Sequence, residues 1–188
     1  MAADNNSLAY IIVESEDGSF RGSVLASDLR GIPVDFRYTE PIRPTKIEKI
    51  LYGNALEVYI KEELILESLI SAVEVKPALW ICKEQNLLAP LRVFTRSKVI
   101  MLMSSNHHPL DSAGDFEPTG ESGVYLVQAD SVSAPLKIMF YSNATENDIK
   151  SVVSLLVNAS QTMELSEPFS RMQKAINAIN SETQSDGK

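Results

Sequence analysis

The stretch Arg30-Gly-Ile-Pro-Val-Asp-Phe-Arg-Tyr-Thr-Glu-Pro-Ile-Arg-Pro-Thr45 contains a turn, a strand and the start of a helix, and it therefore decides the fold class of this chain. Every second residue from Ile32 to Tyr38 is apolar, which predicts a strand with one buried face. Pro33 has no amide proton for a sheet ladder, so we expect it at the beginning of the strand or on a solvent-exposed edge. Pro41 and Pro44 then end the strand.

A helix is predicted directly after this strand, because Thr45 and Glu48 have the spacing of a capping box. Gly53 weakens the helix by about 1 kcal/mol relative to alanine. The polar run from Lys61 to Glu63 also interrupts its apolar stripe. We therefore expect either one long, kinked helix or two helices that meet near Tyr59 to Glu62. The stripe comprises Ile47, Ile50, Leu51, Ala55 and Val58, and then Leu66, Leu69, Ile70 and Val73.

Further strands are predicted on both sides of this helix, from apolar runs that are bounded by turn residues. Upstream, Leu8 to Val13 and Ser23 to Ala26 are expected to form a hairpin around Glu16-Asp17-Gly18. Downstream, strands are expected at 78–82, 92–95, 99–103, 124–128 and 136–141, and residues 104–123 are expected to form a long exposed loop.

Two helices are predicted near the carboxy-terminal end of the chain. Thr145 and Asp148 have the spacing of another capping box, ahead of a helix that ends near residue 162. Ser166 is expected to cap the last helix, with Pro168 in its first turn, where a missing amide proton costs little.

These elements predict an α+β fold: a mainly antiparallel sheet, packed by a long central helix, either continuous or kinked, and by two C-terminal helices. The element order is similar to the layout of longin, roadblock and other profilin-like modules, and the resemblance covers this order alone. We expect a single domain over residues 8–180, a flexible amino terminus at 1–7 and a disordered tail at 181–188.

Composition limits the function classes. The 188 residues include 17 basic and 25 acidic ones, and the net charge of −8 argues against broad, nonspecific binding to nucleic acid or anionic membrane. Cys82 is the sole cysteine and lies in an apolar run, so we expect a buried, unreactive thiol and a reducing, cytoplasmic setting. The sequence predicts neither an export signal nor a membrane span.

Basic and aromatic residues are concentrated between the predicted strand and the helix, in a chain that is otherwise acidic. Arginine pairs bidentately with carboxylate or phosphate, and tyrosine combines an apolar ring with a polar tip, so this set suits an interface or an anion pocket. The alternative is structural: Arg37 and Arg43 pair with neighbouring carboxylates while Phe36 and Tyr38 fill the core. The candidate binding residues are Arg30, Arg37, Tyr38, Arg43, Lys46 and Tyr52.

Three functional hypotheses follow. The first is a noncatalytic protein-binding or adaptor module without a cofactor, which has a protein partner or forms a homodimer. The second is a small enzyme or ligand sensor that uses the loop from His107 to Glu117, in which His107, His108 and Asp111 are weak candidates for a metal site. The third is a nucleic-acid-binding accessory protein, which the acidic balance makes the less favoured hypothesis.

Overall fold

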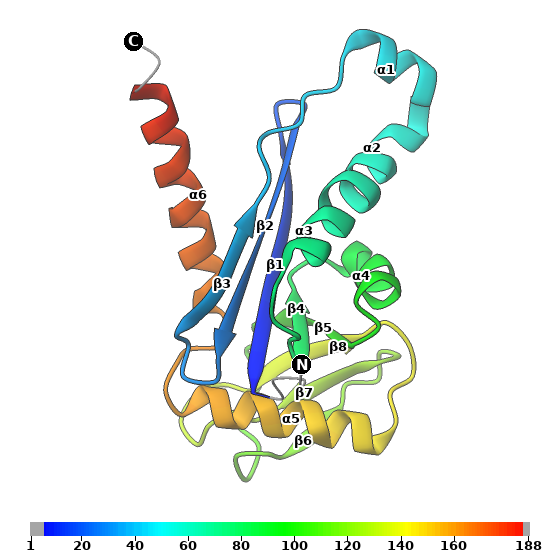
Figure 1. The fold of residues 1–188 in the computed structure, drawn as a ribbon. Helices are drawn as coiled ribbons and strands as arrows, with labels where there is room; N and C mark the ends of the chain where they lie inside the picture. Colours follow the sequence, from blue (N-terminus) through cyan, green and yellow to red (C-terminus); the bar gives the residue numbers. More distant parts are fainter. Residues whose placement is uncertain (1–5, 186–188) are drawn as a thin grey trace.

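The computed structural model of the chain describes residues 6–185. Within them the strands form one eight-stranded sheet, in the order β3-β2-β1-β4-β5-β8-β7-β6 (Figure 1). β1 is parallel to β4 and β4 to β5, whereas the other described neighbours are antiparallel. The strands are β1 (Ser7–Glu16), β2 (Ser19–Asp28), β3 (Pro33–Tyr38), β4 (Leu79–Cys82), β5 (Lys98–Met103), β6 (Phe116–Pro118), β7 (Val124–Val127) and β8 (Leu136–Phe140).

The first hairpin forms as the sequence predicts. Glu16 pairs with Ser19 across a two-residue loop, in which Asp17 and Gly18 have φ angles of 49° and 72°. Positive φ at both central residues is the requirement of the tight turn whose twist matches that of paired strands. β3 occupies one edge of the sheet and begins at Pro33, which confirms the expected position of this proline.

β1 divides the core in two. Leu8 and Tyr10 belong to one cluster of buried side chains, to which α5 (Glu146–Ser160) and α6 (Glu167–Ser185) contribute. Ala9 and Ile11 belong to the other cluster, with side chains from the helices between β3 and β5. Because alternate residues of a strand point to opposite faces, an uninterrupted apolar run is what such a doubly covered strand requires.

The segment between β3 and β4 is helical and broken, as the sequence predicts. It consists of α1 (Lys46–Tyr52), a 3₁₀ turn η1 (Gly53–Ala55), α2 (Leu56–Tyr59), a π-helical stretch η2 (Ile60–Leu66) and α3 (Glu67–Ala72). The break falls at Gly53, where φ is 52°. The wider π turn rotates the apolar stripe, so that Ile60 and Leu66 are both buried.

The first part of this segment leaves its apolar stripe exposed, so the expectation that this stripe is buried is wrong. Ile47, Ile50 and Leu51 are 68%, 69% and 75% exposed, and α1 buries no residue. Figure 1 shows the reason: α1 lies at the end of an arm, formed by α1, η1 and α2, that extends away from the sheet, so no element in the described residues covers its apolar side.

One predicted strand is a helix. Residues 92–95 end α4 (Leu88–Thr95), which follows a 3₁₀ turn η3 (Gln85–Leu87). Leu87, Leu88 and Leu91 are buried at helical spacing, so burial of one helical face determines the conformation here. Arg96, with φ at 53°, ends the helix in the left-handed conformation.

The later elements follow the prediction closely. The capping box of Thr145 and Asp148 opens α5, and α6 begins next to Ser166. α6 continues to Ser185, so residues 181–185, which were expected to belong to a disordered tail, are helical. The predicted loop at 104–123 contains the short strand β6.

Residues 1–5 and 186–188 of the predicted flexible ends lie outside the described residues. No helix in the described part has the length and apolar character needed to cross a membrane.

Candidate nucleic-acid interface

The connection from β3 to α1 is fixed along the edge of the sheet. Thr39 donates its amide to the carbonyl of Gly22 at 2.9 Å, and its hydroxyl accepts from the amide of Gly22 at 2.9 Å. Phe20 and Ile42 exchange two further backbone hydrogen bonds, of 2.9 and 2.7 Å. Because Ile42 packs into the core and neighbours in extended chain point to opposite sides, Arg43 projects into solvent.

The capping box fixes the first turn of α1. The carboxylate of Glu48 accepts from the Thr45 amide at 2.6 Å, and the Thr45 hydroxyl accepts from the Glu48 amide at 3.2 Å. The hydrogen bond from the Thr45 amide, followed by that from its hydroxyl, lowers the pKa of Glu48. Lys46 and Lys49 are three residues apart in this helix, so they lie on one side of it.

Arg43, Lys46 and Lys49 together form a surface that we call the basic strip. All three are exposed, and none has an ion pair or side-chain hydrogen bond within residues 6–185. The amino group of Lys49 lies 4.0 Å from the place that a Cβ on Gly18 would occupy, so α1 and the β1–β2 turn are close neighbours. The basic strip therefore lies beyond the carboxyl end of β1.

Two of the predicted binding residues form ion pairs with acidic neighbours. Arg37 donates to Asp35 at 2.7 Å and to Glu74 at 2.8 Å, and the hydrogen bond to Asp35 is the main reason that the pKa of Arg37 is raised. Arg30 donates twice to Asp28, at 2.9 and 2.7 Å. Arg37 thus pairs with neighbouring carboxylates, as the structural alternative expects, whereas Arg43 has no such partner among the described residues.

The two predicted tyrosines remain accessible. Tyr38 is 43% exposed and lines a hollow of about 310 Å³ together with Arg43 and three acidic residues, Glu16, Asp17 and Glu40. Tyr52 is 42% exposed and stacks on Tyr59, with 4.9 Å between ring centroids. Each ring is supported by the protein and still presents surface to solvent. The structure thus places Tyr38 beside Arg43, and Tyr52 at the end of α1, the helix that carries Lys46. It adds Lys49, which its i, i+3 spacing from Lys46 could have indicated.

The carboxyl ends of parallel strands are where open α/β sheets commonly bind ligands. The strand residues that approach this edge are apolar: Leu8 to Val13 in β1, Leu79 to Cys82 in β4 and Val99 to Met103 in β5 contain no carboxylate. Glu14 follows in β1, where Arg21 donates to it at 3.2 Å. Within residues 6–185 no group of three or more His, Cys, Asp or Glu residues is arranged to hold a metal ion.

The histidine loop does not assemble the weak metal candidate within the described residues. His107, His108 and Asp111 are exposed, and within residues 6–185 they do not form a group arranged to hold a metal ion. The loop is instead tied to the sheet, because Leu110 donates its amide to the side chain of Gln128 at 2.8 Å. Asp115 accepts from the Ser112 amide at 2.8 Å and so serves a turn.

Cys82 is fully buried in β4. Burial raises the pKa of its thiol to about 12, against an ordinary value of 9.0. A neutral thiol is a poor nucleophile, so the expectation of an unreactive cysteine is consistent with its surroundings.

No protein-family model matches the chain, and no curated protein matches its sequence. Solved structures share its fold. Endonuclease V from Bacillus subtilis has a TM-score of 0.58 at 11% identity, over 96% of this chain and 83% of that chain. Human ENDOV has a TM-score of 0.57 at 11% identity, over 91% and 86%. A variant of Ciona intestinalis endonuclease V, in complex with a 23mer DNA containing an inosine followed by a ribo-adenosine, has a TM-score of 0.51 at 10% identity, over 90% and 86%.

These similarities correct three of the expectations. The profilin-like and longin-like layout is wrong, because the matching structures are endonuclease V proteins. The hypothesis of a noncatalytic protein-binding or adaptor module is contradicted by the same matches. The expectation of a protein partner or homo-oligomer, with nucleic acid as the less favoured ligand, is contradicted by the match to a structure that contains DNA.

Proposed function

We propose that this protein binds nucleic acid, with the basic strip in contact with the phosphates. The observation that carries the proposal is the set of three exposed cations that have no acidic partner in the described part of the chain, although acidic residues outnumber basic ones by 25 to 17. Phosphate contacts supply most of the affinity of proteins for nucleic acids, and Lys and Arg side chains make them.

The negative charge elsewhere supports a confined binding site. Between Pro41 and Tyr52 the chain has three basic residues and one acidic residue, and that acidic residue, Glu48, is held in the capping box. A backbone of phosphates would be attracted to this region and repelled by the rest of an acidic surface. Charge therefore favours the basic strip as the place where a strand binds.

Tyr38 and Tyr52 supply a second kind of contact. Bases of an unpaired strand stack on exposed aromatic rings, which contributes about 1–3 kcal/mol for each base. Duplex bases are already stacked on one another and cannot use these rings without unpairing. We therefore expect single-stranded nucleic acid to bind more tightly than duplex.

The likeness of the fold to endonuclease V supports a role in nucleic-acid chemistry. A metal-assisted step also requires side chains that bind the metal ions, and these must be identified separately from the fold. Two-metal nucleases hold their ions with clustered ligands. Within residues 6–185 no cluster of the required kind is present, so we propose binding and assign no hydrolytic step to these residues.

The test is fluorescence anisotropy with labelled single-stranded and duplex oligonucleotides over a range of salt concentrations. The variant Lys46→Gln/Lys49→Gln should weaken binding to every sequence. It should also reduce the slope of log K against log salt by about 0.7 for each lost contact on single strands. The matched control is Lys150→Gln/Lys174→Gln, which removes the same charge from α5 and α6.

The control should bind within about twofold of the unmodified protein, because only the long-range charge changes. Equal losses in both double variants would show a nonspecific charge effect and would overturn the assignment to the basic strip. Absence of binding by the unmodified protein at low salt would overturn the function itself.

A further inference from the structure

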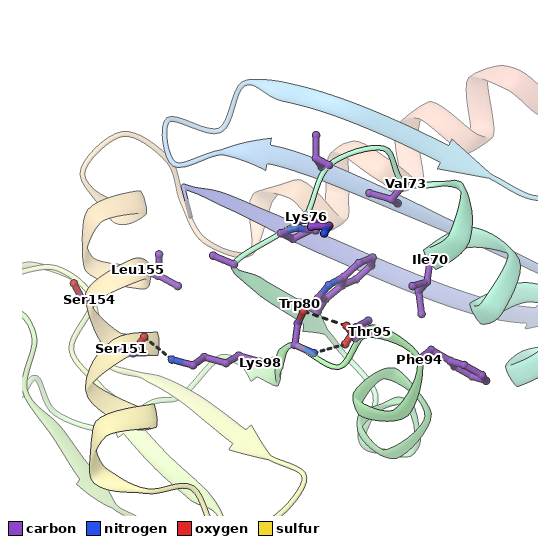
Figure 2. A pocket seen from close by; sticks show the side chains of 14 residues that line it. Ile70, Val73, Lys76, Trp80, Phe94, Thr95, Lys98, Ser151, Ser154 and Leu155 are labelled. Carbon is purple, nitrogen blue, oxygen red and sulfur yellow. Dashed lines mark hydrogen bonds between the residues drawn. The ribbon is translucent and has the colours of Figure 1, made fainter. Parts of the chain in front are cut away.

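A second recess lies at the opposite end of the parallel strands. It is a hollow of about 870 Å³ between the end of α3, the end of α4 and the middle of α5 (Figure 2). Lys76 and Ala78 precede β4, and Lys98 begins β5, so the recess opens at the amino ends of these two strands. It is therefore separate from the basic strip, and its size is that of a small-molecule site.

The charge of this recess differs from that of the protein as a whole. Its fourteen lining residues include two lysines and no aspartate or glutamate, although the chain carries a net charge of −8. Lys76 is exposed and has no ion pair within the described residues. Such a lining favours an anion over a cation or a neutral molecule.

Lys98 is held in place for this role. Its amino group donates to the hydroxyl of Ser151 at 2.6 Å and lies 4.0 Å from the carboxylate of Asp148. That carboxylate accepts hydrogen bonds from Thr145 in the capping box of α5, so it is already engaged in another contact. With its side chain 34% exposed, Lys98 keeps access to a ligand.

The remaining wall is apolar and aromatic. Figure 2 shows Trp80 in the centre of the lining residues, with Ile70 near it and Phe94 farther away on α4. Trp80 is only 3% exposed, yet its indole N–H has no hydrogen-bond partner in residues 6–185. This N–H is not among the buried polar atoms that lack a partner in the described residues, so it reaches the recess, where a ligand acceptor can bond it.

We propose that this recess binds a nucleoside monophosphate. The phosphate group meets Lys76 and Lys98, whose charge-assisted hydrogen bonds are the strong polar contacts that such a group can make. The flat base lies against the apolar wall and accepts a hydrogen bond from Trp80. Inorganic phosphate lacks the base, and a free nucleoside lacks the charge, so neither can make both sets of contacts.

Trp80 also provides the measurement, because it is the single tryptophan of the chain and its fluorescence reports on the recess directly. We expect AMP, GMP, CMP or UMP to change this fluorescence saturably, with isothermal titration calorimetry giving the same affinity. Adenosine and inorganic phosphate, each alone, should bind at least about tenfold more weakly, since each loses one set of contacts.

Three variants make the test specific. Lys76→Gln and Lys98→Gln should each weaken nucleotide binding about tenfold, the loss expected for one charge-assisted contact. Lys76→Gln is decisive if Lys98→Gln fails to fold, because Lys76 is exposed and unpaired in the described part of the chain. Ser154→Phe, at an exposed lining position on α5, should block binding by filling the recess.

The control Lys150→Gln lies on α5 outside the recess and should bind nucleotide as the unmodified protein does. Lys46→Gln/Lys49→Gln should also leave nucleotide binding unchanged, which separates this site from the basic strip. Failure of all four nucleotides to bind would overturn the proposal. So would equal binding of inorganic phosphate, or unchanged affinity in both Lys76→Gln and Ser154→Phe.

Discussion

Gly22 lies directly beneath Ile65. A Cβ on Gly22 would come within 2.3 Å of Cγ2 of Ile65, and within 2.9 Å of a methyl group of Leu69. The glycine in β2 therefore allows the π-helical stretch η2 to pack closely against the sheet.

Gly22→Ala should therefore destabilise the protein, because the added methyl group overpacks a filled site. Overpacking of this kind costs about 1–3 kcal/mol, which urea unfolding would measure. In an Ile65→Ala background, which lacks the clashing atom, the same glycine substitution should cost less. Equal costs in both backgrounds would mean that the contact between these residues is not the cause.

Tyr10→Phe should leave the protein as stable as before or stabilise it by about 1 kcal/mol. The Tyr10 hydroxyl is buried without a hydrogen-bond partner in the described part of the chain, and burial raises the pKa of this phenol. The ring itself would keep its edge-to-face contact with Phe169, at 5.2 Å between centroids. Thermal unfolding is the measurement, and Tyr141→Phe, at an exposed position, should change nothing. A clear loss of stability in Tyr10→Phe would show that the Tyr10 hydroxyl makes a stabilising hydrogen bond.

Thr45→Ala and Thr145→Ala remove equivalent capping boxes and should have unequal consequences. α5 buries Ile149, Val152 and Leu156, so the loss of its cap should lower the free energy of unfolding by about 0.5–2 kcal/mol. α1 buries no residue, so Thr45→Ala should speed amide hydrogen exchange in the arm and leave global unfolding nearly unchanged. Similar global losses in the two variants would show that the arm packs against the rest of the protein.

Arg37→Gln and Arg43→Gln should separate a structural arginine from a binding one. Arg37 pairs with Asp35 and Glu74, so its loss should lower the melting temperature and leave oligonucleotide affinity nearly unchanged. Arg43 has no ion pair in the described residues, so its loss should weaken binding and reduce the salt slope by about 0.7 on single strands. Anisotropy and thermal unfolding on the same samples would check both. Weaker oligonucleotide binding by Arg37→Gln, together with unchanged binding by Arg43→Gln, would show that Arg43 is not part of the interface.

Local patterns in the sequence were sufficient for much of this fold. The capping boxes at Thr45 and Thr145, the turn at Gly18 and the edge position of Pro33 each depend on contacts within a few residues. Periodicity also indicated the disruption between Gly53 and Glu62. These features require only local hydrogen bonds and backbone preferences, which the amino-acid order determines directly.

Contacts between distant segments were not predictable in the same way. The apolar stripe of α1 is typical of a buried helix, and nothing within it shows that the arm leaves the sheet. Residues 92–95 fit a strand until Leu87 and Leu88 are seen to share a buried helical face with Leu91. Arg37 and Arg43 look equivalent in the sequence, and the carboxylate of the distant Glu74 helps to distinguish them.

The parallel pairing of β1 with β4 has a consequence for the order of folding. β1, β2 and β3 are joined by short turns and can pair with one another soon after they are synthesised, whereas Leu8 must wait for Leu79 to complete its other side. Until then β1 exposes an apolar edge that can recruit other chains. The nascent protein is thus most vulnerable to aggregation while the ribosome is still translating the helical segment between β3 and β4.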